Sequence, residues 1–265
     1  YRLNTTVEQP ATVGVTETDL ARAPAGRPDR GPALRVRLVR GQLSSATRQA
    51  FLNGANAMAI GNGDDDLWEI LQFRDATLVG PGTWDLSFRL RGQRGTDAVT
   101  PPVWPAGSAV VMLNERMVQL DLPLSDRGLP KYYRAGPVDR PLDHPSYRQA
   151  IRAFSGVGLR PLSPVHLRLH ERDGDLDITW TRRTRIDGDS WQGIDVPLGE
   201  ETEAYTVEVL RDGAVLRRAE TASPGWTYGA AERAADAGPG SIQIRVAQLS
   251  RAWGAGPFAA LDIPG

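Results

Sequence analysis

The chain has 265 residues, a length that suits about two domains with cores of their own. Its 31 basic and 32 acidic side chains leave a net charge of −1, which excludes a bulk electrostatic attraction to nucleic acid or to an anionic membrane. There is no cysteine, so disulfides, thiolate chemistry and cysteine zinc sites are excluded, and assembly inside the cell is favoured. No apolar run approaches the ~20 residues of a membrane-spanning helix.

Residues 1–32 are predicted to be a linker or a strand that belongs to a preceding domain. The stretch 23–32 (APAGRPDRGP) contains three prolines and two glycines, which neither a helix nor a central strand accepts. Because the chain begins with Tyr1 rather than methionine, we expect it to be the C-terminal part of a longer polypeptide.

A first domain is predicted over residues 33–156. The alternation of Leu34, Val36 and Leu38 with arginines predicts a strand with one solvated face. A short helix is expected within residues 44–54, capped by Ser44 or Ser45, and strands are expected at 57–60 and 67–73.

The clearest pattern in this domain is a hairpin over residues 75–91, with Gly-Pro-Gly at 80–82 as its turn. On the returning strand one face is predicted to be apolar, formed by Trp84, Leu86, Phe88 and Leu90, and the other polar, formed by Asp85, Ser87, Arg89 and Arg91. A second hairpin is predicted from 109–113 and 117–122, with a further strand at 131–138. Since no helical periodicity is sustained, the domain is predicted to be a compact β-barrel or a small β-sheet domain.

Residues 157–265 are predicted to form a second β domain. Seven short strands recur at regular spacing, and Leu176, Ile178 and Trp180 would place a tryptophan in the core. This is typical of an immunoglobulin-like sandwich, and the tryptophan on the second strand favours the fibronectin type III subtype. Ile242 stands where that subtype usually has a tyrosine, so the hydrogen bond of that corner must be absent or replaced. The fold class is therefore predicted as all-β.

Candidate chemistry is sparse in the sequence. There is no GxSxG elbow, phosphate-binding loop or dinucleotide fingerprint. His166 and His170 are four residues apart, but on a predicted strand and without a third ligand at suitable spacing, so they are interpreted as surface side chains. We expect no catalytic residue, no cofactor and no metal site, and therefore no enzyme.

Two arginine-rich stretches are the possible interaction surface, although both also have a structural interpretation. The first candidate contains Arg182, Arg183, Arg185, Asp187, Asp189 and Trp191. It could contact a partner or an acidic glycan, or it could be a self-paired loop stiffened by Arg–Asp forks. The second contains Arg91 and Arg94 beside glycines and could equally be a turn with basic flanks.

The tryptophans keep a carbohydrate-binding hypothesis open. Four of the seven lie outside the strand positions predicted to be buried, and they could line a groove that stacks on sugars: Trp68, Trp104, Trp191 and Trp253.

Three stretches together resemble one family: 69–97 (EILQFRDATLVGPGTWDLSFRLRGQRGTD), 158–166 (GLRPLSPVH) and 178–205 (ITWTRRTRIDGDSWQGIDVPLGEETEAY). The resemblance is to the C-terminal region of the large baseplate protein of gene transfer agents and related siphophage tails, the megatron or tail-tip (host-specificity) protein. It spans residues from about 33 to the end, and LRGQRGTD followed by WTRRTRIDGDSW is its most specific part.

The resemblance implies a structural component of the distal tail baseplate of a phage-like particle, with a role in tail-tip assembly and host-cell contact during DNA delivery. Implied partners are other tail and hub proteins, a homotrimer of the chain itself, and a host surface glycan. No nucleic acid contact is expected. The implied location is the particle's tail, assembled in the bacterial cytoplasm. The alternative function is a carbohydrate-binding module for host surface polysaccharide.

Overall fold

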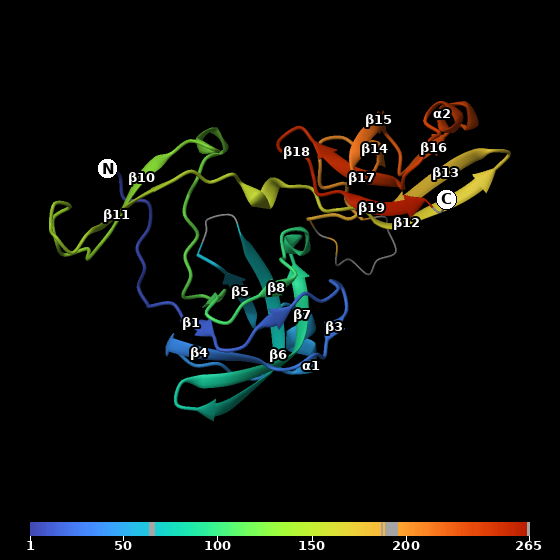
Figure 1. Ribbon diagram of the computed structural model, residues 1–265. Helices are drawn as coiled ribbons and strands as arrows, with labels where there is room; N and C mark the ends of the chain where they lie inside the picture. Colours follow the sequence, from blue (N-terminus) through green and yellow to red (C-terminus); the bar gives the residue numbers. More distant parts are fainter. Residues whose placement is uncertain (64–66, 187, 189–195, 264–265) are drawn as a thin grey trace. The chain divides into compact units, whose positions relative to one another are not determined.

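The structure is a computed structural model that describes residues 1–63, 67–186, 188 and 196–263 (Figure 1). It contains two compact units, Tyr1–Val157 and Gly158–Gly265, each of which is described by itself. Both are built almost entirely from antiparallel strands, so the all-β prediction is confirmed.

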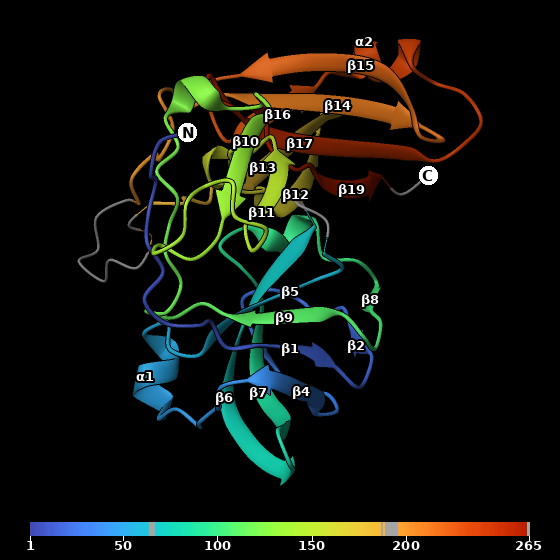
Figure 2. The same ribbon diagram turned by 90° about the vertical axis from the view of Figure 1, so that its left-hand side faces the viewer.

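The first unit contains a closed barrel of six strands (Figure 2). Their order around the barrel is β7-β4-β1-β9-β5-β6, and β6 pairs with β7 to close it. Closure leaves no open edge within the barrel. The strands are β1 (Val13–Thr16), β4 (Leu34–Arg40), β5 (Ala57–Gly61), β6 (Trp68–Gly80), β7 (Thr83–Gln93) and β9 (Ala109–Met112).

The N-terminal segment corrects one expectation, because part of residues 1–32 belongs to the barrel. β1 lies between β4 and β9 and pairs with both. Short strands follow it: β2 (Leu20–Ala21) pairs with β8 (Val103–Trp104), and β3 (Pro28–Asp29) pairs with β7. The proline-rich stretch 23–32 was predicted as part of a linker. Its prolines lie in connections and on the peripheral strand β3, where a missing backbone N–H is tolerated.

The barrel core follows the predicted alternation on β4, where Leu34 and Val36 are fully buried and Leu38 packs against them. The helix α1 (Arg48–Leu52) is capped by Thr47, which accepts a hydrogen bond from Ala50 N–H, and not by the predicted serines. The second predicted hairpin is also wrong. β9 pairs with β1 and β5, and no strand forms over 117–122.

β7 departs from strict alternation at Phe88, whose φ is +53°. Before this residue Leu86 faces the core as predicted, but after it Arg89 and Arg91 are buried while Leu90 is half-buried. Phe88 lies outside the core cluster, with its ring 5.8 Å from that of Phe51 in an edge contact. A left-handed φ reverses the facing of the following residues and is a genuine outlier for a bulky side chain.

After β9 comes a long stretch, residues 113–160, in which no residue is buried. It includes η2 (Leu124–Asp126), η3 (Val157–Leu159) and a two-stranded ribbon of β10 (Lys131–Ala135) and β11 (Arg148–Arg152). The ribbon is a sheet of its own. None of its residues belongs to either hydrophobic core.

The second unit is a sandwich of two sheets, as predicted. One sheet has the order β12-β13-β16 and the other β15-β14-β17, with β18 and β19 both paired to β17. Their shared core joins Trp180 on the first sheet to Tyr205 on the second, with rings 5.1 Å apart. The bounds are β12 (Val165–Arg172), β13 (Asp175–Thr181), β14 (Tyr205–Arg211), β15 (Ala214–Thr221), β16 (Gly225–Tyr228), β17 (Ile242–Ser250), β18 (Gly254–Ala255) and β19 (Ala259–Ile263).

The corner where the usual tyrosine is replaced by Ile242 uses another tyrosine. Tyr228, at the end of β16, donates its hydroxyl to Asp236 at 2.7 Å. Asp236 ends the helix α2 (Ala230–Ala235) and also accepts from Arg217 at 3.0 Å. The connection between β16 and β17 is thus tied to β15 by an ionic hydrogen bond.

Candidate functional site

A buried ion pair lies in the barrel between β6 and β7. Glu69 and Arg91 are both fully buried. They form a bidentate pair with distances of 2.6 Å to Oε1 and 2.8 Å to Oε2. The carboxylate also accepts from the Trp104 indole N–H at 2.7 Å and from the Gly92 backbone N–H at 3.0 Å. Four donors therefore satisfy the two oxygens of a charge that would otherwise be very costly to bury.

A second carboxylate extends this network from β3. Asp29 accepts two hydrogen bonds from Arg89, at 3.0 and 2.9 Å, and lies 3.5 Å from Arg91. Burial alone would raise the pKa of Asp29. The backbone N–H of Gly31 and the charges of Arg89 and Arg91 outweigh burial, so this pKa lies below its ordinary value. We call Asp29, Glu69, Arg89, Arg91 and Trp104 the barrel network.

The barrel network changes the interpretation of the second arginine-rich stretch. Arg91 was predicted as part of an interaction surface, but it is buried and its remaining Nη1 donates to the Ala21 carbonyl at 2.7 Å. It cannot contact a partner in this fold. Arg94 is exposed on the turn after β7, with φ +55°. The two arginines are therefore not brought together in one surface.

Glu69 was not predicted as functionally or structurally special, and Trp104 was predicted only as a possible sugar-stacking side chain. The signal was present in the alternation of β6, where Glu69, Leu71 and Phe73 share one face. A carboxylate in register with two core residues requires a buried cation and points to one on a neighbouring strand.

The first arginine-rich stretch leaves β13 and pairs mainly with backbone. Arg182 donates to the carbonyls of Val196 and Pro197 at 2.9 and 2.8 Å and lies 3.7 Å from Glu203. Arg185 donates to Glu200 at 2.8 Å and to the Gly199 carbonyl at 3.0 Å. Both arginines thus hold the segment 196–203 against the end of β13.

The other members of that stretch are placed less closely or not at all. Arg183 is half-buried. Asp187, Asp189 and Trp191 lie outside the described residues, so the predicted Arg–Asp forks are not among the interactions described. Glu200 and Glu203 supply the carboxylates that the structure shows instead.

The sandwich has one more concentrated ion group, on the outer face of β14. Glu208 is buried and accepts from Arg218 at 2.8 Å and from Arg245 at 2.6 Å. Burial raises its pKa, but the hydrogen bonds from Arg245 and Arg218 outweigh this and hold the pKa below its usual value. Arg245 also lies over the Phe258 ring, 4.5 Å from its centroid.

The tryptophans do not form the predicted groove as a set. Trp104 is in the barrel core and its indole N–H is used by Glu69, so it cannot stack on a sugar. Trp68 is half-buried and its ring covers Gly61, where a Cβ would approach it to 2.6 Å. Trp253 is half-buried, and Trp191 lies outside the described residues.

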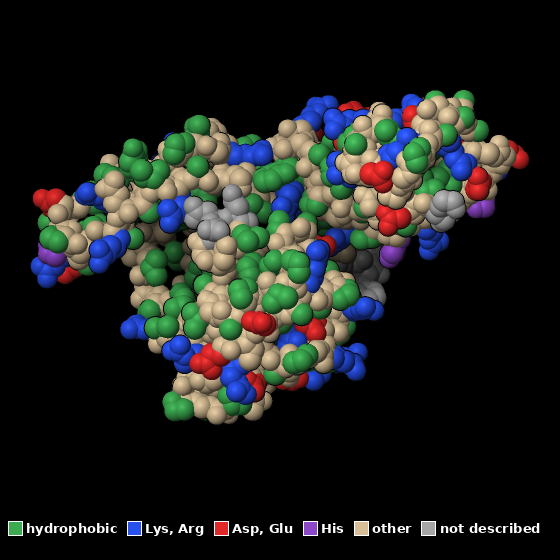
Figure 3. Space-filling model, in the orientation of Figure 1, with side chains coloured by type: hydrophobic (Ala, Val, Ile, Leu, Met, Phe, Trp, Pro, Cys, Tyr) green, Lys and Arg blue, Asp and Glu red, His purple; other side chains and the backbone are tan. Residues whose placement is uncertain are grey.

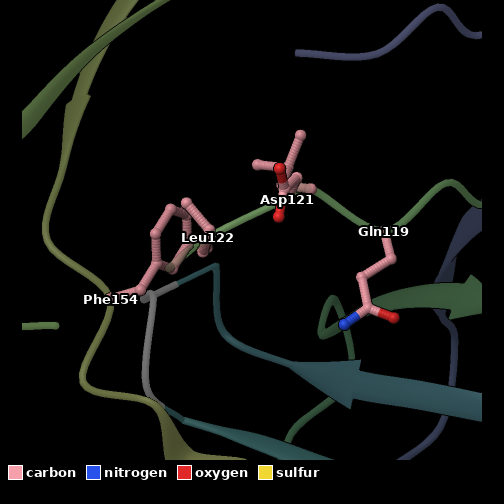
Figure 4. Close-up of a pocket in the computed structure, with 5 residues that line it drawn as sticks. Gln119, Asp121, Leu122 and Phe154 are labelled. Atoms are coloured by element: carbon pink, nitrogen blue, oxygen red, sulfur yellow. The ribbon is translucent and has the colours of Figure 1, made fainter. Parts of the chain in front are cut away.

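The first unit has open hollows, two of which are candidate binding surfaces. One, of about 470 Å³, is lined by Arg30, Gly31, Arg74, Asp75, Ser87 and Phe88. The other, of about 600 Å³, is lined by Gln119, Leu120, Asp121, Leu122 and Phe154 (Figure 4). In the view of Figure 4, Leu122 lies beside Phe154 and Gln119 lies at the other end.

Within residues 1–63, 67–186, 188 and 196–263, no three His, Asp or Glu side chains are grouped to hold a metal ion. In the same ranges no helix has both the length and the apolar character needed to span a membrane.

Comparison with known families gives a match that falls on the barrel. Residues 11–111 match the family described as "Rcc01698-like, C-terminal". The match is consistent with a protein related to gene transfer agents. It begins just before β1 and ends within β9, so it covers the closed barrel and its network but neither the ribbon nor the sandwich.

Other comparisons add no functional argument. A search of curated proteins found no match. Among solved structures, domains d3-d4 of the rat CD45 extracellular region are 8% identical with a TM-score of 0.28, over 57% of this chain and 72% of that one. A β-glucuronidase from Ruminococcus gnavus is 11% identical with a TM-score of 0.28, over 89% of this chain and 37% of the enzyme. One from Lactobacillus rhamnosus is 11% identical with a TM-score of 0.27, over 88% of this chain and 35% of the enzyme.

Proposed function

We propose that the chain is a structural component of the distal tail baseplate of a phage-like particle of the gene transfer agent type. In this role it supports tail-tip assembly and host-cell contact during DNA delivery. The observation that carries the proposal is the match of residues 11–111 to the Rcc01698-like family over the barrel. The sequence resemblance of residues 69–97 and 178–205 to large baseplate proteins supports the same role.

The physical character of the two units suits a structural role. The barrel buries a fully hydrogen-bonded ion network, an arrangement in which each charge depends on strands that are distant in sequence. Such a network favours one rigid arrangement of β3, β6, β7 and β8. Rigid modules with exposed connecting segments are well suited to assembly through surfaces rather than to chemistry in a pocket.

Electron microscopy of intact particles tests the proposal directly. Particles carrying an affinity label in this chain should show the label at the distal end of the tail, and particles from a strain that lacks the chain should lack density there. Label in the head or along the tail tube would overturn the proposal, as would complete baseplates in the absence of the chain.

A second candidate function, binding of an acidic surface polysaccharide, is favoured by the hollow around Phe88. The guanidinium of Arg74 lies 4.0 Å from the centroid of the Phe88 ring, and that of Arg30 lies 5.2 Å from it. Arg74 is also paired with Asp75. Because Asp75 neutralises Arg74, the Arg30 guanidinium beside the Phe88 ring is the group that would attract an anion, and carboxylated sugars carry suitable anions.

Titration with an oligogalacturonate, compared with a neutral dextran, tests this second function. The acidic sugar should shift the amide resonances of Ser87 and Phe88 while the dextran leaves them unchanged. Arg30→Ala should raise the dissociation constant for the acidic sugar at least about tenfold, equivalent to ~1.4 kcal/mol of binding free energy. Arg40→Ala, which removes an exposed arginine on β4, is the matched control. Equal responses to both sugars would exclude the anion site.

A further inference from the structure

The ribbon of β10 and β11 is a sheet without a core. A two-stranded hairpin by itself is at best marginally stable in water. Tyr133 on β10 makes an edge contact with Phe154 at 5.8 Å, and Gly128 N–H donates to the Phe154 carbonyl at 2.8 Å, so the base of the ribbon is anchored. On its other face the Arg134 guanidinium lies over the Tyr1 ring, 5.3 Å from the ring centroid, but no core residue packs there.

The two faces of the ribbon differ in chemistry. Tyr132 pairs with Ile151 and Arg134 with Gln149, so these four side chains share one face. Tyr132 is 61% exposed and Ile151 is 50% exposed, which leaves an aromatic–aliphatic cross-strand pair in solvent. The opposite face carries Lys131, Tyr133, Ala135, Arg148, Ala150 and Arg152.

The ribbon is also strongly basic. Its two strands contain Lys131, Arg134, Arg148 and Arg152 and no acidic residue. Lys131 is paired with Asp126 at 2.9 Å, whereas the exposed Arg148 has no side-chain partner among the described residues. Figure 3 shows hydrophobic and basic side chains together on the surface where Figure 1 draws β10 and β11.

The edges of the ribbon are open. β11 pairs with β10 and with no other described strand, so its outer edge presents backbone groups that an added strand can bond. In an added strand, successive side chains alternate between the two faces. Beside β11, one set would lie next to Ile151 and the other next to Arg148 and Arg152.

We propose that the outer edge of β11 binds an extended segment of a partner protein in which apolar and acidic residues alternate. The apolar residues lie on the Tyr132–Ile151 face, and the acidic residues lie on the face that carries Arg148 and Arg152. Pairing of this edge with the same edge of a second copy is disfavoured, because it would place arginines against arginines. The inference rests on the ribbon alone and does not require the baseplate assignment.

Two capped peptides test the proposal with the full chain. In one, valine and glutamate alternate; in the other, valine and lysine alternate. The glutamate peptide should shift the backbone amide resonances of residues 148–152 and slow their hydrogen exchange, while the lysine peptide should do neither. Arg148→Glu should weaken binding of the glutamate peptide at least about tenfold, equivalent to ~1.4 kcal/mol.

Arg140→Glu is the matched control, because it makes the same charge change on the exposed connection between the two strands. It should leave binding within about twofold. Ile151→Ser should weaken binding without changing the charge, and the amide resonances of β10 report whether the ribbon is still paired in that variant. Equal responses to both peptides, or shifts confined to residues outside 148–152, would overturn the proposal. Such a failure would leave the particle-labelling test of the proposed function unaffected.

Discussion

Arginines of the barrel and of the sandwich occur in similar sequence contexts, but Arg89 and Arg91 of the barrel are buried and Arg185 of the sandwich stays partly exposed. Arg89 and Arg91 turn into the barrel and pair with Asp29 and Glu69, whereas Arg185 stays at the surface of the sandwich and holds a neighbouring loop. The difference arises from backbone direction, since the left-handed φ of Phe88 reverses the faces of β7. Residue type alone therefore does not separate an interaction surface from a structural core.

The energetic consequences of the two arrangements also differ. A buried pair replaces water on both ions, so the loss of one partner leaves an uncompensated charge in a dry environment. A partly exposed arginine that loses its partner is rehydrated, and the cost is correspondingly small. This contrast can be tested by removing one partner at a time in each unit.

Removal of the Glu69 charge should have the largest effect. Glu69→Gln leaves the buried guanidinium of Arg91 without its carboxylate, and we expect the barrel to lose ~3–5 kcal/mol of unfolding free energy. Native-state hydrogen exchange of the amides of Leu71 and Leu86 in the full chain measures this for the barrel alone. The control is Glu17→Gln, which breaks a half-exposed pair with Arg37 and should cost ~0–1 kcal/mol. Similar losses in both variants would contradict the buried-pair interpretation.

A smaller loss is expected when the turn that donates to Glu69 is altered. Gly92 has φ +58°, and a Cβ there would lie 2.7 Å from the backbone Cα of Asp97. Gly92→Ala adds this clash to the cost of ~1–2 kcal/mol for a left-handed alanine, so we expect more than ~2 kcal/mol by denaturant unfolding. Gly107→Ala is the control, because its φ is +91° but the space around it is open. If the two variants lose the same stability, the close approach to Asp97 is unimportant.

In the sandwich, removal of the carboxylate that pairs with Arg185 should have a modest effect. Glu200→Gln breaks the 2.8 Å ionic bond from Arg185, but the remaining guanidinium is 22% exposed, can be rehydrated and keeps its bond to the Gly199 carbonyl, so we expect a loss of ~1–2 kcal/mol. Hydrogen exchange of β14 amides provides the measurement. A loss as large as that for Glu69→Gln would erase the distinction between the two units.

An effect of a different kind is expected at alkaline pH. Burial, followed by the hydrogen bond to Asp236, raises the pKa of Tyr228 to about 12 from 10.0. Its contribution is complete below pH 10 and is lost between pH 10 and about 12, because the unfolded chain releases this proton first. Tyr228→Phe should therefore reduce the fall in sandwich stability over that range, as measured by denaturant unfolding at each pH. If the unfolding free energy falls equally with pH in both proteins, Tyr228 is not the cause of the alkaline loss of stability.

Local patterns were sufficient where side chains alternate without interruption. β4, the pairing of β6 with β7 around its Gly-Pro-Gly turn and the sandwich core around Trp180 could all be predicted, because a half-buried strand imposes period two on its own sequence; on β7 this holds only before Phe88. The predicted interaction residues fared differently. Arg91 is buried in the barrel, whereas Arg94 is exposed on the turn after β7.

The failures share a physical cause, which is dependence on distant strands. β1 looks like a tether until β4 and β9 supply its hydrogen bonds. Residues 117–122 alternate plausibly, but β9 is already paired on both sides and offers them no edge. The serines predicted to cap α1 lose that position to Thr47, since a shift of a few residues in a helix start is decided by what the helix packs against.

The sequence alone determined that this protein is all-β, that it has a barrel-like domain and a sandwich, and that it resembles a tail baseplate family. Composition, period-two alternation and turn residues are local properties, so they can be read without coordinates. Only the tertiary structure decided three features: the closure of the barrel, the burial of Glu69 with Arg91, and the exposure of the ribbon of β10 and β11. Each depends on which strands that are distant in sequence pack together. The free energy of burial arises from that packing and cannot be assigned to a single segment.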